Sequence, residues 1–435
     1  MTRNIRGFGL VLSAVALVAA GCGGGGTEGP EEGSLKGEKL TVLGVWSGAE
    51  QENFKKVLDA FEDQTGATVT YSSAGDQMST VLGGQIEGGK PPDVAIVSQP
   101  GLMKNLAADG ALKPVNKDVE AAIGENYAPV WKDLGSVDGE VYGVWIKAAN
   151  KSLMWYNTQA FEDAGVEEPK TWDEFNTTLS TLADAGTSPL SVAGSDGWTL
   201  TDWFENVYLQ VAGPEKYDQL TNHEIPWTDQ SVKDTLKILG DLWGGANNIP
   251  GGPKAALQVK FQDSVTNVFA DNPKAAIVYE GDFVGGVIGA ETNAKVGETA
   301  KFFSFPEAKS GAGNSVVGGG DVALALKDGK GAQGLLEFLA APAAAEIWAK
   351  EGGFVSPNKG LDLSAYKDDP TRQIAKAIID SGDNFRFDMS DLAPAAFGGT
   401  VGKGEWKALQ DFLGNPTSVE ETAKKLESEA AKAYK

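Results

Sequence analysis

The chain has 435 residues, a formal net charge of −23 at pH 7, one cysteine and one histidine. The negative charge repels phosphate groups, so we expect no nucleic-acid partner. One cysteine and one histidine exclude an intramolecular disulfide and the zinc sites that need several such ligands. The sequence has neither a P-loop nor a G-x-S-x-G nucleophile elbow. We therefore expect a protein that is not an enzyme, with no catalytic residues, no metal site and no cofactor.

The first residues are typical of a secretory signal peptide. Arg3 and Arg6 form a short basic start, and the apolar stretch 8–20 that follows is too short for a membrane-spanning helix. The segment Ala19-Ala20-Gly21-Cys22 looks like the lipobox at which bacterial lipoproteins are cleaved and acylated. We expect a signal peptide over 1–21 and lipidation of Cys22. The segment 22–38, rich in glycine and poor in large apolar residues, is predicted to be a flexible tether.

The segment 39–98 alternates between strand and helix patterns. Phe54, Val57, Leu58 and Phe61 share one face of a predicted helix, and a second helix is predicted over 78–86. Three β-rich runs flank these helices: KLTVLGVW (39–46), ATVTYSS (67–73) and PDVAIVS (92–98). This order predicts a parallel sheet with right-handed crossovers. Ligands bind beyond the carboxyl ends of such strands, which here means near Trp46, Ser47, Gly48, Asp76, Ser98 and Gln99.

The length of the chain predicts two lobes. GVWIKAANKSLMWYN (143–157) has the pattern of two apolar strands with a polar interruption, as a crossing between lobes requires. Thr171 with Glu174, and Ser418 with Glu421, are predicted capping boxes. We predict an α/β protein in which each lobe is a sheet flanked by helices. Lobe 1 is assigned to 39–147 and 318–357, and lobe 2 to 152–315 and 365–435.

Several segments resemble, in chain order, the carbohydrate-binding lipoproteins of bacterial ABC importers, the group that includes the maltose-binding proteins. The resemblance implies a periplasmic-binding-protein-like fold with a ligand cleft between the lobes. A C-terminal segment, FRFDMSDLAPAAFGG (385–399), resembles the branch that imports α-glucosides. The other matching segments are Trp46-Ser47-Gly48, Pro92-Asp93-Val94, WYNTQAFEDAGVEEPKTWDEF (155–175), ADNPKAAIVYEGDF (270–283), GGGD (318–321) and SPNK (356–359).

The resemblance also implies which residues bind the ligand. Ser47 and Glu50 match the first ligand loop of the family, and Gln99 matches a polar ligand residue after the third strand. Asp321 ends the GGGD segment, where Gly320 lets the backbone approach the ligand. Glu50 fits equally well as an acidic residue at a helix N-terminus.

Further candidate ligand residues depart from the family pattern or have an equal structural alternative. Asn150 stands where relatives often have an acidic residue, and Asp282-Phe283 replaces a Gly/Pro-Trp pair, so Phe283 offers a smaller ring face. Phe354 and Asp391 fit packing or ion-pair roles equally well. Asp76 completes the predicted set.

Two tryptophans of DGWTLTDWFENVYLQVAG (196–213) are given different roles. Trp203 shares a helical stripe with Leu200, Phe204 and Val207, so we expect it in the core. Trp198 precedes that stripe in a loop, and the resemblance implies an aromatic residue here that stacks on a sugar ring.

The resemblance implies an extracytoplasmic protein, anchored to the cell membrane by its N-terminal lipid, that captures a sugar by lobe closure and delivers it to an ABC permease. Two other functions fit the same residues. A secreted glycoside hydrolase would use two of the many carboxylates, and acidic and aromatic residues together would also suit a polyamine.

Overall fold

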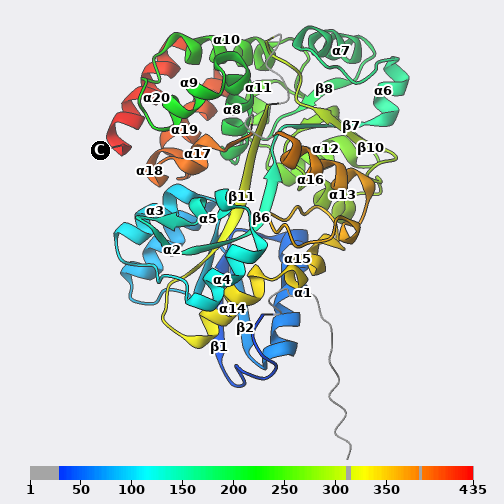
Figure 1. Ribbon diagram of the computed structural model, residues 1–435. Coiled ribbons are helices and arrows are strands. Elements are labelled where there is room, and N and C mark those ends of the chain that lie inside the picture. Colours follow the sequence, from blue (N-terminus) through cyan, green and yellow to red (C-terminus); the bar gives the residue numbers. More distant parts are fainter. Residues whose placement is uncertain (1–28, 310–314, 382–384, 435) are drawn as a thin grey trace, which may run out of the picture.

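The computed structural model describes residues 29–309, 315–381 and 385–434. These residues form two lobes, one above the other in Figure 1, connected by long strands. The predicted signal peptide (1–21) and Cys22 lie outside the described residues. Within them, no helix combines the length and the apolar character that crossing a membrane requires.

Lobe 1, the lower body in Figure 1, is built on a six-stranded sheet of order β12-β11-β3-β1-β2, with β6 also paired to β11. β1 (Lys39–Gly44) runs parallel to β2 (Thr68–Ser73) and to β3 (Val94–Val97), which confirms the predicted parallel sheet. The other elements of lobe 1 are α1 (Gly48–Thr65), η1 (Gly75–Gln77), α2 (Met78–Glu87), α3 (Pro100–Ala108), α4 (Lys117–Asn126), α5 (Pro129–Leu134), β4 (Ser136–Val137), β5 (Glu140–Val141), β6 (Gly143–Asn150), β11 (Val316–Ala325), α14 (Lys330–Ala340) and α15 (Pro342–Ala349).

The predicted apolar stripe of α1 is confirmed, because Phe54, Val57, Leu58 and Phe61 are all buried. The helix ends at Gly66, which has a left-handed backbone (φ 73°) and donates its N–H to the Glu62 carbonyl. Glycine adopts this conformation without the steric cost that a side chain would add.

Lobe 2, the upper body in Figure 1, is built on a four-stranded sheet of order β10-β7-β9-β8. Thr171 and Glu174 form the predicted capping box, but the predicted box at Ser418 is wrong, because the Ser418 hydroxyl donates to the Asn415 carbonyl instead. The elements of lobe 2 are β7 (Leu153–Asn157), α6 (Thr158–Ala164), α7 (Trp172–Asp184), β8 (Ser188–Ser191), α8 (Trp198–Ala212), α9 (Pro214–Thr221), α10 (Gln230–Gly244), α11 (Pro253–Ala256), α12 (Phe261–Phe269), β9 (Ala275–Tyr279), α13 (Val284–Glu291), β10 (Ala300–Ser304), η2 (Leu363–Ala365), α16 (Asp369–Ser381), α17 (Met389–Leu392), α18 (Ala395–Gly398), α19 (Gly404–Gly414) and α20 (Val419–Ala433). β12 (Phe385–Phe387) precedes α17 in the chain.

The chain crosses between the lobes along two neighbouring strands, β6 and β11, which pair antiparallel. Lys151 and Ser152 lie between β6 and β7, at the polar interruption where the sequence predicts a crossing. The Lys151 N–H donates to the Val317 carbonyl at 2.8 Å, and the Val317 N–H donates to the Ser152 hydroxyl at 2.9 Å. The two crossings are therefore tied to each other by hydrogen bonds.

Two segments lie elsewhere than expected. β12, which we assigned to lobe 2, pairs with β11 in the six-stranded sheet. The end of the predicted tether packs on lobe 1: Leu35 is buried, its N–H donates to the Thr65 carbonyl, and the Gln64 side chain donates to the Pro30 carbonyl. One buried leucine and these backbone bonds are enough to dock residues 30–38, so the predicted tether over 22–38 is too long.

A group of buried carboxyls surrounds the first crossing. The Lys151 ammonium forms ion pairs with Asp202, Asp388 and Asp391. Glu205, Glu280 and Glu405 are also buried in this part of lobe 2. One ammonium cannot balance six buried carboxylates, so several of these groups must stay protonated. Burial accordingly raises the pKa of Glu280 to about 8, an effect that the nearby Lys151 opposes.

This raised pKa makes folding stability fall as pH rises. Folded Glu280 retains its proton where the unfolded chain has lost it, so its contribution is complete below pH 4.5 and is lost as the pH rises through about 8. The expected slope is up to ~1.4 kcal/mol per pH unit for one proton. Glu280→Gln, which mimics the protonated group, should remove this slope from urea unfolding curves measured between pH 5 and 8.

The matched control is Glu52→Gln, since the Glu52 side chain is 67% exposed. It should leave the pH dependence of unfolding at the wild-type slope. If the free energy of unfolding changes equally with pH in the wild type and in Glu280→Gln, folded Glu280 does not hold a proton in this pH range.

Candidate functional site

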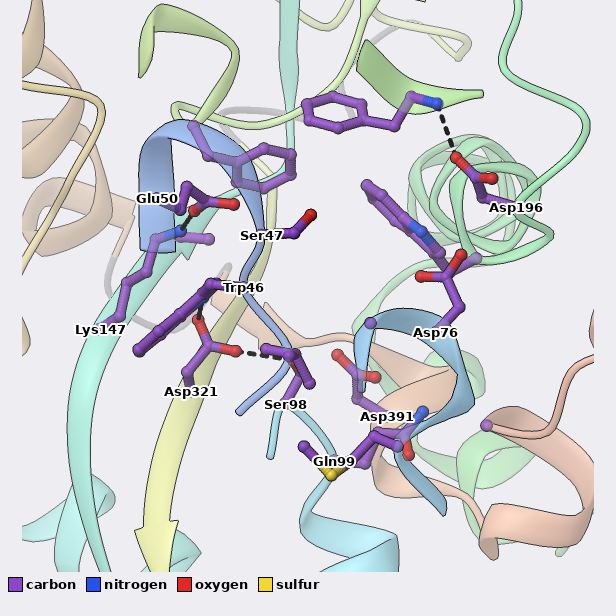
Figure 2. A pocket seen from close by; sticks show the side chains of 18 of the residues that line it. Trp46, Ser47, Glu50, Asp76, Ser98, Gln99, Lys147, Asp196, Asp321 and Asp391 are labelled. Atoms are coloured by element: carbon purple, nitrogen blue, oxygen red, sulfur yellow. Dashed lines mark hydrogen bonds and ion pairs between the residues drawn. The ribbon is translucent and has the colours of Figure 1, made fainter. Parts of the chain in front are cut away.

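A cavity of about 340 Å³ lies between the two lobes. Both lobes contribute to its walls, and Figure 2 shows side chains from several elements pointing into it. From lobe 1 it is lined by Val45, Trp46, Ser47, Glu50, Gly75, Asp76, Met78, Ser79, Ser98, Gln99, Lys147, Ala149, Gly320 and Asp321. From the crossing and lobe 2 it is lined by Lys151, Asp196, Trp198, Lys260, Phe261, Gln262, Phe283, Asp391, Gly399 and Trp406.

Nine of the twelve residues that we predicted to bind a ligand line this cavity. The parallel strands β1, β2 and β3 place the residues that follow their carboxyl ends at one edge of the sheet, as the topology predicts. The nine are Ser47, Glu50, Asp76, Gln99, Trp198, Phe283, Gly320, Asp321 and Asp391.

The other three predicted residues, Asn150, Asp282 and Phe354, do not line the cavity. Lys147 and Ala149 of β6 line it, as does Lys151 directly after the strand, and Asn150 therefore lies on the opposite face of the strand. Asn150 and Asp282 instead order the crossing: the Asn150 N–H donates to Asp282 Oδ1 at 2.7 Å, and Asn150 Oδ1 accepts from the Ser152 N–H at 2.9 Å. Phe354 is buried in a stack on Trp348, with ring centroids 4.9 Å apart.

Asp321 is held in one orientation by two other lobe 1 residues (Figure 2). Its Oδ1 accepts a hydrogen bond from the Ser98 hydroxyl at 2.6 Å, and its Oδ2 accepts from the Trp46 indole N–H at 3.3 Å. Gly320 precedes it, where a Cβ would lie 2.4 Å from the Lys147 carbonyl oxygen. The close pairing of β11 with β6 therefore requires glycine at this position.

Glu50 and Lys147 form an ion pair in the same wall of the cavity (Figure 2). Lys147 is 3% exposed. Burial alone would lower the pKa of Lys147, but the carboxylates of Glu50, Asp321 and Asp282 raise it, so the side chain stays charged. Glu50 thus has a structural partner as well as a place in the cavity wall.

Three aromatic rings form the lobe 2 side of the cavity. Trp198, the first residue of α8, lies 5.4 Å from Phe261 and 6.0 Å from Phe283 between ring centroids. Phe261 and Phe283 are 5.3 Å apart. Trp203, by contrast, is 2% exposed and packs on Tyr279 and Phe305, as predicted for a core residue. The two tryptophans therefore have different surroundings although they share one helix.

Asp76 connects the lobes at the cavity. It lies in η1 of lobe 1, and its carboxylate accepts a hydrogen bond from the Trp198 side chain of lobe 2. Burial, together with the nearby Asp196, raises the pKa of Asp76 to about 6, while Lys260 and the Trp198 hydrogen bond oppose the shift. Asp196 in turn accepts the Phe261 N–H at 2.6 Å, which fixes the start of α12 (Figure 2).

The predicted set did not include several charged or aromatic cavity residues, among them Lys147, Lys151, Asp196, Lys260 and Trp406. The sequence did contain a signal for Lys147 and Lys151, because a lysine inside the apolar run 143–157 is costly to bury unless it has a charged partner. Trp406 is 5% exposed, and its indole N–H has no hydrogen-bond partner in the part of the chain that the structure describes. Its position in a C-terminal helix is not marked by any local pattern.

The cavity combines flat apolar rings with fixed hydrogen-bonding groups. Aromatic rings can stack on an apolar ligand face, and carboxylates accept hydrogen bonds from hydroxyl groups. This combination suits a small polyhydroxylated molecule.

Comparisons with known proteins place the chain in a family. The family model "Bacterial extracellular solute-binding protein" matches residues 46–346. The osmoprotective compounds-binding protein GgtB of Synechocystis sp. is 34% identical over 411 residues, covering 93% of this chain and 94% of that protein. The α-glucosides-binding periplasmic protein AglE of Rhizobium meliloti is 35% identical over 405 residues, covering 89% and 86%.

Solved structures share the fold. The bacterial solute receptor AcbH superposes with a TM-score of 0.79 at 22% identity, covering 92% of this chain and 100% of that one. RafE with bound raffinose superposes with a TM-score of 0.73 at 17% identity, covering 90% and 99%. The family model matches most of the chain, and two relatives are more than 30% identical over long alignments. This chain belongs to the bacterial extracellular solute-binding proteins.

Proposed function

We propose that this protein captures a sugar of the α-glucoside class in the cavity between its lobes and delivers it to an ABC permease. The observation that carries the proposal is the cavity itself, where an aromatic wall from lobe 2 faces oriented carboxylates of lobe 1. The relatives support it by name, since one binds osmoprotective compounds and another α-glucosides. Among proteins of the same fold, RafE binds raffinose and AcbH prefers β-D-galactopyranose.

In this proposal each lobe supplies half of the binding site. Ser47, Glu50, Gln99, Gly320 and Asp321 of lobe 1 contact the ligand from one side, with Asp76 at the join between the lobes. Trp198, Phe283 and Asp391 contact it from the other. A ligand that bridges both halves binds the closed form more tightly than an open one, so its binding shifts the population toward closure. The permease then receives the closed form.

The direct test is a calorimetric and thermal-shift panel of α-glucosides, other sugars and polyamines. A ligand at 100 times its Kd stabilises the folded protein by about 2.7 kcal/mol, which raises Tm measurably. We expect saturable binding of an α-glucoside and none of spermidine. Binding of amines alone would replace the sugar proposal with a polyamine one.

Substituting each of the two tryptophans of α8 distinguishes a residue that contacts the ligand from one that packs in the core. Trp198→Ala should weaken sugar binding by about 5- to 150-fold, because losing the stacked ring costs about 1–3 kcal/mol. Its unliganded Tm should fall less than that of Trp203→Ala, since Trp198 is only partly buried and lines a cavity. Trp203→Ala should show the opposite pattern, with a loss of about 3–5 kcal/mol in folding stability. Calorimetric titration and unliganded melting measure the two effects; a Trp198 variant with wild-type affinity would contradict the assignment.

We also propose that the protein is anchored through lipid on Cys22. Six residues, 23–28, separate Cys22 from the described chain, and six extended residues reach at most about 20 Å. Since residues 30–38 are docked on α1 and β2, this short reach would hold lobe 1 close to the membrane.

Replacing the anchor residue tests this proposal. Cys22→Ala should leave ligand binding and Tm unchanged, because Cys22 precedes the folded body, and should release the protein from membranes. The measurement is membrane fractionation with a high-salt wash, which removes proteins held by charge alone. A variant that still sediments with membranes would rule out the lipid anchor.

A further inference from the structure

We propose that the site admits ligands of one or two sugar rings, and that a contact between the lobes at Gly101 and Gly399 sets this limit. The inference rests on the proposed function and adds the size class of the ligand. We call this contact the seam; it consists of Ser79, Gln99 and Gly101 of lobe 1 with Ala393 and Gly399 of lobe 2.

The seam brings the backbone of Gly101 and of Gly399 so close to the opposite lobe that neither position has room for a Cβ where the neighbouring atoms now lie. The Ser79 hydroxyl donates to the Gly399 carbonyl at 3.1 Å. A Cβ on Gly101 would lie 1.8 Å from the Ala393 carbonyl oxygen, and a Cβ on Gly399 would lie 2.2 Å from Gln99 Nε2. Both distances are far below van der Waals contact. In Figure 1, α17 and α18 lie directly above α3, the helix that carries Gly101.

The seam also forms a wall of the cavity, because Ser79, Gln99 and Gly399 line it. A second contact between the lobes lies on the side of α13. There a Cβ on Gly353 would lie 2.5 Å from the Gly286 Cα atom, and the Lys147 ammonium lies 5.2 Å from the centroid of the cavity-lining Phe283. The cavity is thus bounded by contacts on two sides.

The enclosed volume limits the ligand. About 340 Å³ is near the lower end of the ~300–1,000 Å³ typical of ligand pockets. This is room for one or two sugar rings, and a longer chain would have to part the seam. Parting it forfeits the Ser79 hydrogen bond and the packing of Gly101 on Ala393. Long oligosaccharides therefore bind to a form that lacks these contacts.

Calorimetry on the full-length protein in detergent tests the limit, with glucose, trehalose, maltose, maltotriose and maltopentaose as probes. We expect the tightest mono- or disaccharide to bind at least tenfold more strongly than maltopentaose. Equal or tighter binding of maltopentaose would overturn the size limit and leave the sugar-binding function standing. If no sugar in this series or in the wider panel binds, the proposed function itself fails, and the size limit fails with it.

Gly101→Ala tests the role of the seam. Alanine fits the α3 helix, and the clash lies across the lobes, so unliganded Tm should stay near wild type while the closed form is penalised. Affinity for the short ligand should fall about tenfold or more, because a smaller fraction of molecules reaches the closed form. Maltopentaose should lose less, so the preference for short ligands should shrink.

The matched control is Gly84→Ala in α2, where a Cβ would meet no atom within 4 Å. It should bind every probe as the wild type does. If Gly101→Ala also keeps the full wild-type preference, the seam does not set the limit. The wild-type series decides the size class even if the variant folds poorly.

Discussion

The ion pairs of Lys151 are the interaction on which the site depends. Lys151 lies where the chain leaves lobe 1, and its ammonium contacts Asp202 of α8 together with Asp388 and Asp391 near α17. The same ammonium lies 5.8 Å from the centroid of the Trp198 ring. One buried charge thus connects three segments that are far apart in sequence, and each of them carries a cavity residue: Lys151, Trp198 and Asp391. Removing one partner of a buried ion pair commonly costs about 3–5 kcal/mol, because it leaves the other charge unpaired.

The alternation of side chains along the strand next to Lys151 determines which residues face the cavity. Side chains alternate along β6 and into the residue that follows it, so Lys147, Ala149 and Lys151 face the cavity while Asn150 faces the crossing. The neighbouring strand β11 places Gly320 and Asp321 beside them. A single pair of antiparallel strands therefore supplies part of the cavity wall and also carries the chain between lobes.

Local patterns in the sequence were sufficient for the elements and for much of the site. The period of Phe54, Val57 and Phe61 predicts α1, and the strand order then predicts where the loops after β1, β2 and β3 meet. Local patterns failed where the position of a residue depends on contacts with residues that are distant in the sequence. Leu35 looked like part of a tether because its apolar contacts come from the rest of lobe 1. Asn150 was assigned by resemblance, whereas its hydrogen bonds to Ser152 and Asp282 depend on the fold. Trp406 was missed because only the tertiary structure brings its helix to the cavity.

The charges around the cavity bear on what kind of ligand it can hold. Two of its lysines form ion pairs with protein carboxylates: Lys147 with Glu50, and Lys151 with three aspartates. The third, Lys260, lies near Asp76 and Asp196, whose negative charges it favours. An anionic ligand would meet carboxylates and would have to displace an existing ion pair to gain one of its own. A neutral ligand with many hydroxyl groups has no such cost, since its hydroxyls can donate to carboxylates without displacing an ion pair. The acidic surface of the protein and its engaged lysines thus favour uncharged, hydroxyl-rich solutes over phosphorylated ones.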